Sequence, residues 1–290
     1  MKIASVIDIE SAASLEDDYI KEQLDYLQDK KIHRVLVYSR NVNVNFLKEV
    51  SDHIMRSYSI SPILAISPLL WEASALAAYL SSVYAKFGKK LCINLICGSD
   101  NSNENKYEQL EKFYNDVNDE LANEGIDIKE LVLDIYLAGN SPDAVVISER
   151  YKLKHLVYPT KEHICRTEND TMQASFGLNV CMLDKGELWN DVCSEIKGER
   201  KSLLYRKMSI ARSNSKWLND INEQEDSYGY STILFQKGMS NAPTVYGTKE
   251  ELKERFDKLK SGGLKDLILH GSFNNKQLAN VISLLENQEY

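Results

Sequence analysis

Residues 91–100 read Leu-Cys-Ile-Asn-Leu-Ile-Cys-Gly-Ser-Asp, and this stretch shows how the chain is built. The apolar run at 91–96 predicts a buried strand, and the small polar residues that follow predict a loop. A helical pattern begins at 104 and continues to 121. A strand followed directly by a helix is the repeating unit of α/β folds with a parallel sheet.

The same alternation runs through the whole chain. Strands are predicted at 2–7, 34–38, 62–67, 91–96, 131–138, 154–158, 176–183 and 266–270. Helices are predicted at 18–30, 46–54, 69–87, 104–121, 250–259 and 276–285, with one more that starts at Pro142. Eight strands, most of them followed by a helix and without an antiparallel hairpin signal, favour an α/β fold of the (β/α)8 TIM-barrel type.

A doubly wound sheet with an appended region remains the alternative fold. No Gly-x-Gly-x-x-Gly turn follows the first predicted strand, which makes a dinucleotide-binding domain a weak interpretation. The polar segment 187–226 predicts an insertion between strands seven and eight. Because no linker or low-complexity segment divides the sequence, we expect one domain over residues 1–290.

The charge balance excludes some classes of partner. The 290 residues include 35 basic and 43 acidic side chains, for a net charge of −8. Broad binding to nucleic acid or to an anionic membrane needs clustered cations, so neither is expected. No apolar run approaches the roughly 18 residues of a membrane span, and residues 1–8 predict a strand instead of a signal peptide. We therefore expect a soluble, cytoplasmic protein.

The cysteines and histidines do not predict a metal site. The five cysteines are odd in number and contain no Cys-x-x-Cys pair, and the five histidines lack His-x-x-x-His spacing. These residues are Cys92, Cys97, Cys165, Cys181, Cys193, His33, His53, His155, His163 and His270. His270 ends the last predicted strand, where a structural role is favoured over a role as a base.

Two loops that follow strands carry candidate binding residues, since barrel chemistry collects at the C-terminal ends of the strands. Gly98 allows a ligand to approach the backbone, and Tyr107 in the next helix could contact a phosphate or stack on a ring. In the run Gly139-Asn140-Ser141, a helix start offers free N–H groups to an anion, with the Ser141 hydroxyl as a further donor. The alternatives are an ordinary strand–helix turn at Gly98 and simple N-terminal capping by Ser141.

Seven segments match the motifs of one protein family in order. The run 93–100 resembles the N-L-V-T-G-S/G-D strand of luciferase-like flavin monooxygenases, most nearly the alkanesulfonate monooxygenases. Lys106-Tyr107-Glu108 resembles the R-Y-E motif of that family. The other matching segments are 76–90, 136–157, 175–178, 245–248 and 267–271.

The resemblance implies a luciferase-like barrel with a shortened insertion between strands 7 and 8. It implies that the protein binds reduced FMN supplied by a separate flavin reductase. O2 would add to the flavin C4a, and the resulting C4a-peroxide would attack a small organic substrate. Relatives of this kind are commonly homo-oligomers. By the same resemblance, Tyr107, Gly139, Asn140 and Ser141 hold the FMN phosphate. Asn94 and Gly98 lie along the flavin ring or ribityl chain, and Ser67 with Pro68 lies under the ring.

Three candidate catalytic residues stand where the family motifs place reactive groups. Cys181 takes the position of a histidine, and Lys237 takes that of an arginine in the segment before the V-G motif. Arg40 lies in the element where the family carries a thiol. Arg40 and Lys237 could bind an anionic substrate group or the flavin peroxide. These replacements leave three alternatives open: a flavin-binding relative without catalysis, a deazaflavin-dependent oxidoreductase, and an interaction protein that binds no flavin.

Overall fold

A computed structural model of the chain describes residues 1–8, 18–38, 43–97, 105–165, 174–189, 191–192, 229–231, 242–270 and 275–286. Its contacts divide the chain into two compact units. The N-terminal unit contains residues 4–156, and the C-terminal unit contains residues 1–3 and 157–290.

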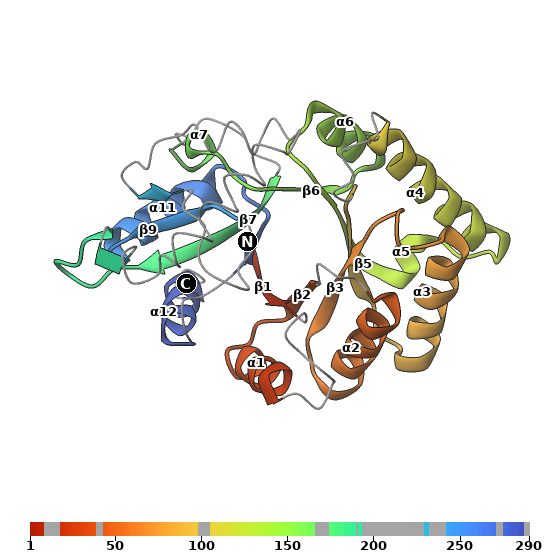
Figure 1. The fold of residues 1–290 in the computed structure, drawn as a ribbon, viewed down its shortest axis with the longest axis horizontal. Coiled ribbons are helices and arrows are strands. Elements are labelled where there is room, and N and C mark those ends of the chain that lie inside the picture. The colour runs from red at the N-terminus through yellow and green to blue at the C-terminus, as the bar shows by residue number, and fades with distance from the viewer. Residues whose placement is uncertain are drawn as a thin grey trace, which may run out of the picture. The chain divides into compact units, whose positions relative to one another are not determined.

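The N-terminal unit is an all-parallel sheet covered by helices. Neighbouring strands pair in chain order from β1 to β6. In Figure 1 the helices α2, α3 and α4 line one face of this sheet. The strands are β1 (Lys2–Asp8), β2 (Arg34–Tyr38), β3 (Ser61–Ile66), β4 (Leu91–Leu95), β5 (Val132–Ala138) and β6 (Lys154–Val157). The helices are α1 (Asp18–Asp29), α2 (Val44–Ser57), α3 (Ala73–Phe87), α4 (Lys106–Asn123), α5 (Ile128–Leu131) and α6 (Pro142–Tyr151).

Local sequence signals explain where several of these helices begin and end. The Asn43 side chain accepts hydrogen bonds from two backbone N–H groups and caps α2. Pro142 occupies the first turn of α6, where its missing N–H costs nothing. Gly88 takes a left-handed conformation with a φ of 61° and ends α3.

A buried charge cluster on the inner face of the sheet shows that the sheet is strongly curved. Arg34 on β2 forms an ion pair with Asp134 on β5 and donates a 2.8 Å hydrogen bond to the Tyr136 hydroxyl. Lys154 at the start of β6 lies 3.0 Å from the other oxygen of Asp134. Strands β3 and β4 separate β2 from β5, which corresponds to about 14 Å along a flat sheet at ordinary strand spacing. Side chains can meet across that distance only on the concave side of a curved sheet.

The charge state of the cluster follows from its contacts. Burial opposes ionisation of Asp134, but the hydrogen bond with Lys154 and the charges of Arg34 and Lys154 outweigh it and hold the pKa of this carboxyl below 3.8. Burial likewise opposes the charge on Arg34, and its neighbours Cys92, Tyr136 and Asp134 raise its pKa. The cluster is therefore ionised and internally neutralised, apart from one excess positive charge.

The C-terminal unit contains a second group of strands. β7 (Ala174–Met182) pairs in parallel with β10 (Asp266–Leu269) on one side and with β9 (Thr244–Gly247) on the other. The short β8 (Tyr230–Ser231) runs antiparallel to β9. Helices α7 (Lys161–Cys165), α11 (Lys249–Ser261) and α12 (Asn275–Glu286) belong to this unit. A capping box between Thr248 and Glu251 fixes the start of α11.

The eight predicted strands are all present, and their bounds agree with the structure within two residues. Helix α3 begins at Ala73 and not at 69, because the backbone N–H groups of Leu70 and Trp71 both turn back to the carbonyl of Ser67. The expectation of no antiparallel pairing was wrong for β8 and β9, since a two-residue strand is too short to produce an alternating pattern. The predicted insertion at 187–226 lies largely outside the described residues, and the single-domain assignment stays a prediction.

No described helix has the length and apolar character that a membrane span requires. Within the same described ranges, no three His, Cys, Asp or Glu side chains form a potential metal site.

Replacing Asp134 by alanine should destabilise the protein strongly, because Arg34 and Lys154 would lose their shared carboxylate in a buried setting. We expect a loss of about 3 kcal/mol in the free energy of unfolding, measured by urea denaturation. The control is Asp29→Ala, which removes an exposed ion pair with Lys30 and should cost about 0.5 kcal/mol or less. Equal effects of the two substitutions would contradict the account of the cluster.

Candidate functional site

The start of helix α6 combines a side-chain cap with backbone N–H groups of the first helical turn. Ser141 has an extended backbone, and its Oγ accepts a 3.2 Å hydrogen bond from the Ala144 N–H. The predicted capping role of Ser141 is therefore confirmed. Because Oγ acts here as an acceptor, the hydroxyl hydrogen is still available for a second partner. The helix dipole adds partial positive charge at the same place.

Tyr107 of α4 lies directly against the end of strand β5. A Cβ atom added at Gly139, which has a φ of 147°, would overlap the Tyr107 hydroxyl oxygen. The Gly139 carbonyl accepts a 2.6 Å hydrogen bond from His155 Nε2, which fixes this turn from the other side. Only glycine meets both requirements, the backbone conformation and the close approach of the hydroxyl.

The Tyr107 hydroxyl interacts with the side chains of Ser141 and Cys97. Burial raises the pKa of Tyr107 to about 12, so the phenol is neutral and can donate at physiological pH. Burial also raises the pKa of Cys97 to about 11, an increase that the charge of Lys106 partly offsets. Cys97 is thus a thiol and not a thiolate at neutral pH.

Lys106 supplies the positive charge of this cluster. Its ammonium lies 5.8 Å from the centroid of the Tyr107 ring. Lys106 matches the basic residue of the R-Y-E motif but was not among the predicted binding residues. Asp143, exposed in the first turn of α6, opposes this charge. The cluster therefore combines one cation, two hydroxyls and a helix start with one nearby carboxylate.

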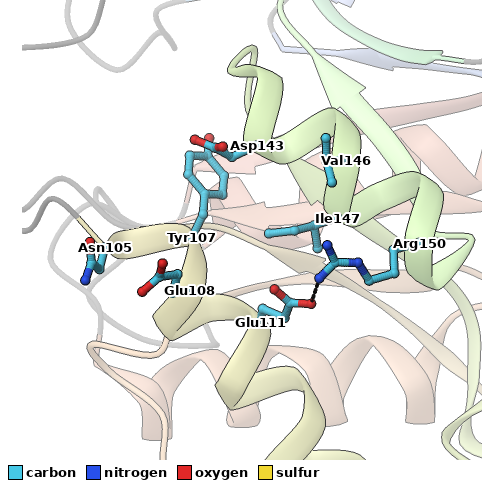
Figure 2. Close-up of a pocket in the computed structure, with 8 residues that line it drawn as sticks. All are labelled: Asn105, Tyr107, Glu108, Glu111, Asp143, Val146, Ile147 and Arg150. Carbon is cyan, nitrogen blue, oxygen red and sulfur yellow. Dashed lines mark hydrogen bonds and ion pairs between the residues drawn. The ribbon is translucent and has the colours of Figure 1, made fainter.

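A pocket of about 320 Å³ opens beside this cluster, between α4 and α6. Figure 2 shows the Tyr107 ring reaching toward Asp143, and Arg150 of α6 pairing with Glu111 of α4. The pocket residues are Asn105, Tyr107, Glu108, Glu111, Asp143, Val146, Ile147 and Arg150. Three carboxylates against a single paired arginine disfavour a phosphate inside the pocket. An anion would find hydrogen-bond donors instead at Ser141 and Tyr107, at the start of α6.

Asn94 and Ser67 lie on neighbouring strands of the same unit. Asn94 on β4 is only 4% exposed, and its Oδ1 has no hydrogen-bond partner among the described residues. Its register places it level with Ala65 on β3 and Tyr136 on β5, so it shares their face of the sheet. The buried Ser67 Oγ accepts a 3.3 Å hydrogen bond from the Leu69 N–H. An unsatisfied buried amide oxygen is costly, and a bound ligand or water that donates to it would remove that cost.

Of the other predicted site residues, the structure describes Cys181 and Asn140. Arg40, Gly98 and Lys237 lie outside the described residues. Cys181 lies in β7 of the C-terminal unit and is 1% exposed. Asn140 is partly exposed, just before Ser141. The structure therefore brings together Tyr107, Gly139 and Ser141 with the additional residues Lys106 and Cys97, and the roles of all these residues stay predictions.

No family model and no curated protein matches this sequence. Solved structures do match it. EDTA monooxygenase EmoA from Chelativorans sp. BNC1 has a TM-score of 0.60 at 11% identity over 100% of this chain and 94% of its own. Long-chain alkane monooxygenase LadA has a TM-score of 0.59 at 9% identity over 100% and 91%. Riboflavin lyase RcaE, solved with modified FMN and riboflavin, has a TM-score of 0.56 at 9% identity over 99% and 90%.

At such identities the likeness shows the fold. The fold class is a (β/α)8 TIM barrel, as the sequence predicted. The doubly wound alternative is thereby excluded.

Gly139→Ala should cost more stability than Gly125→Ala, although both glycines have positive φ. Gly125 has open space where a Cβ would lie, so its substitution adds only backbone strain of about 1 kcal/mol. At Gly139 the new methyl would also displace the Tyr107 hydroxyl, and we expect a total of about 2–3 kcal/mol in urea unfolding.

The Tyr107→Phe background provides the internal control for this prediction. Removing the hydroxyl should relieve part of the overlap and make Gly139→Ala less costly. If the cost of Gly139→Ala is the same in both backgrounds, Tyr107 does not lie against Gly139 as described.

Proposed function

We propose that this protein is a flavin-dependent monooxygenase that binds reduced FMN and uses O2 to oxidise a small organic substrate. The observation that carries the proposal is the cluster of Lys106, Tyr107 and Ser141 at the start of α6, in the same unit as the unsatisfied Asn94 oxygen. The likeness to EmoA and LadA, both described as monooxygenases, and to RcaE, solved with modified FMN, supports the same class.

The residues at α6 fit a phosphate monoester. Its oxygens would accept hydrogen bonds from the free N–H groups of the first helical turn and from the hydroxyls of Ser141 and Tyr107. The Lys106 ammonium would balance part of its charge. Asp143 reduces the net attraction, so this site should bind the phosphate of a larger ligand and not free phosphate with high affinity.

Asn94 fits the ring portion of the same ligand. Its buried Oδ1 can only accept, and a flavin ring carries an N–H that can donate to it. Ser67, at the end of the adjacent strand β3, is likewise buried and polar. Together with the phosphate residues, these side chains would orient the cofactor and limit the access of water.

Bound reduced FMN would supply the activation of O2. As the resemblance to two-component flavin monooxygenases implies, we assign reduction of the flavin to a separate reductase. Arg40, Cys181 and Lys237 remain the proposed residues on the substrate side. A homo-oligomeric state is part of the same proposal.

Substitution of the residues proposed to hold the phosphate should weaken the binding of FMN and leave the binding of riboflavin unchanged, because riboflavin lacks the phosphate. Tyr107→Phe and Ser141→Ala should each raise the Kd of FMN about fivefold, and Lys106→Ala should raise it tenfold or more. The measurement is quenching of flavin fluorescence on titration with protein.

The matched control is Lys112→Ala, an exposed lysine on the same helix, which should leave both affinities unchanged. If wild-type protein binds neither FMN nor reduced FMN at tens of micromolar, the proposed function is wrong. If the variants weaken FMN and riboflavin equally, the phosphate lies elsewhere.

A further inference from the structure

A row of polar side chains crosses three adjacent strands in the C-terminal unit. Asn179 on β7 is level with Thr244 on β9. Strands β10 and β7 pair in register from Leu267 to Leu269, and the His270 N–H continues this pairing by donating a 3.0 Å hydrogen bond to the Leu178 carbonyl. His270 is therefore level with Asn179. Residues that are level in parallel strands point to the same face. His270, Asn179 and Thr244 therefore share one face of this sheet, at about 5 Å from strand to strand.

This face is the one opposite the aliphatic and aromatic side chains of β7. Phe176, Leu178 and Val180 alternate with the row and are buried, and the Phe176 ring meets His163 of helix α7. The face of the row instead carries Gly177 and Asn179. Two different environments thus lie on the two sides of one strand.

Each residue of the row keeps hydrogen-bonding capacity that the described residues do not use. Asn179 and Thr244 are 0% exposed, and neither Asn179 Oδ1 nor Thr244 Oγ1 has a partner there. The Asn179 amide nitrogen is held by the Ala242 carbonyl at 2.8 Å, so the free oxygen is fixed in orientation. Both ring nitrogens of His270 are also inaccessible and without a partner in the described part of the chain. Three such residues side by side need an explanation, because most buried polar groups in native cores have a partner.

The surroundings of His270 are shaped to hold its ring. A Cβ at Gly177 would come within 2.7 Å of His270 Nε2 and 3.0 Å of the Tyr158 ring. Tyr158 packs edge-on against the imidazole, with ring centroids 5.2 Å apart. Burial lowers the pKa of His270 to about 3, so the ring is a neutral imidazole with one donor and one acceptor nitrogen.

We propose that the row His270–Asn179–Thr244 binds an uncharged carboxamide-type group of the substrate. Asn179 Oδ1 requires a donor, whereas the Thr244 hydroxyl and the imidazole N–H can each serve an acceptor. A carboxamide presents N–H and C=O side by side and meets both needs. This inference rests on the proposed function and adds a substrate class to it.

The charges on this face favour an uncharged group over an anion. Among the described residues of β7, β9 and β10, the positions on the face of the row carry no lysine or arginine. They do carry an acidic side chain, Asp266, which accepts a 3.2 Å hydrogen bond from Ser175. A sulfonate or carboxylate on this face would have no cation to pair with at these positions and would lie near the Asp266 carboxylate. Its burial would therefore be costly.

The first arm of the test measures the free protein. Thr244→Val keeps the shape of the side chain and removes only a hydroxyl without a partner, so the urea midpoint should stay equal or rise. The matched control is Ser175→Ala on the same sheet, which removes a hydroxyl that is hydrogen-bonded and should lower the midpoint. A loss with Thr244→Val as large as that with Ser175→Ala would overturn the proposal, because the Thr244 hydroxyl would then be satisfied within the protein.

The second arm measures binding with three probes that share one ring: benzamide, benzenesulfonate and benzylamine. Calorimetric titration of the full chain, without flavin and again with FMN, should show binding of benzamide and at least tenfold weaker binding of the two charged probes. Thr244→Val and His270→Phe should each raise the Kd of benzamide at least tenfold. Absence of benzamide binding, equal affinity for benzenesulfonate, or unchanged benzamide affinity in both variants would overturn the proposal.

FMN affinity of the same variants separates this inference from the proposed function. We expect Thr244→Val and His270→Phe to change the Kd of FMN less than twofold. A tenfold loss of FMN affinity would mean that the row holds the flavin and not the substrate. If wild-type protein binds benzamide but not FMN, the proposed function fails while the amide site stands.

Discussion

The carboxylate of Asp134 is the point on which the N-terminal unit depends. It joins Arg34 on β2 to Lys154 on β6, across strands that lie between them in the sheet, and so holds the sheet in its curved form. All strands of this sheet are parallel, so their C-terminal ends collect at one edge. Ser67 and Gly139 come just after two of those ends, and Asn94 lies near a third. The buried ion cluster at one end of the strands thereby supports the polar residues at the other.

Each candidate site includes a buried polar group that the described residues leave without a hydrogen-bond partner. Asn94 in the N-terminal unit and Asn179 and Thr244 in the C-terminal unit are almost wholly buried, with an oxygen that lacks a partner among the described residues. Each such oxygen costs about 1–3 kcal/mol of desolvation. Asp134, by contrast, is buried with two cations.

The features that depend on short-range sequence patterns were predicted correctly. Apolar runs located the strands, and Pro142 and Gly88 marked helix ends, because these signals act over a few residues. The sequence could not predict the contact between Arg34 and Asp134, which are 100 positions apart, nor the close approach of Tyr107 to Gly139, which follows from packing. The short α5 and β8 were missed because four and two residues show no period.

The most direct test of the proposed monooxygenase is the reaction of photoreduced FMN with air-saturated buffer in the presence of excess protein, followed by the return of oxidised-flavin absorbance. The account predicts a time course that differs clearly from that of free reduced FMN, and a return to the free rate with the double variant Lys106→Ala/Tyr107→Phe. A wild-type time course that coincides with free reduced FMN would contradict it.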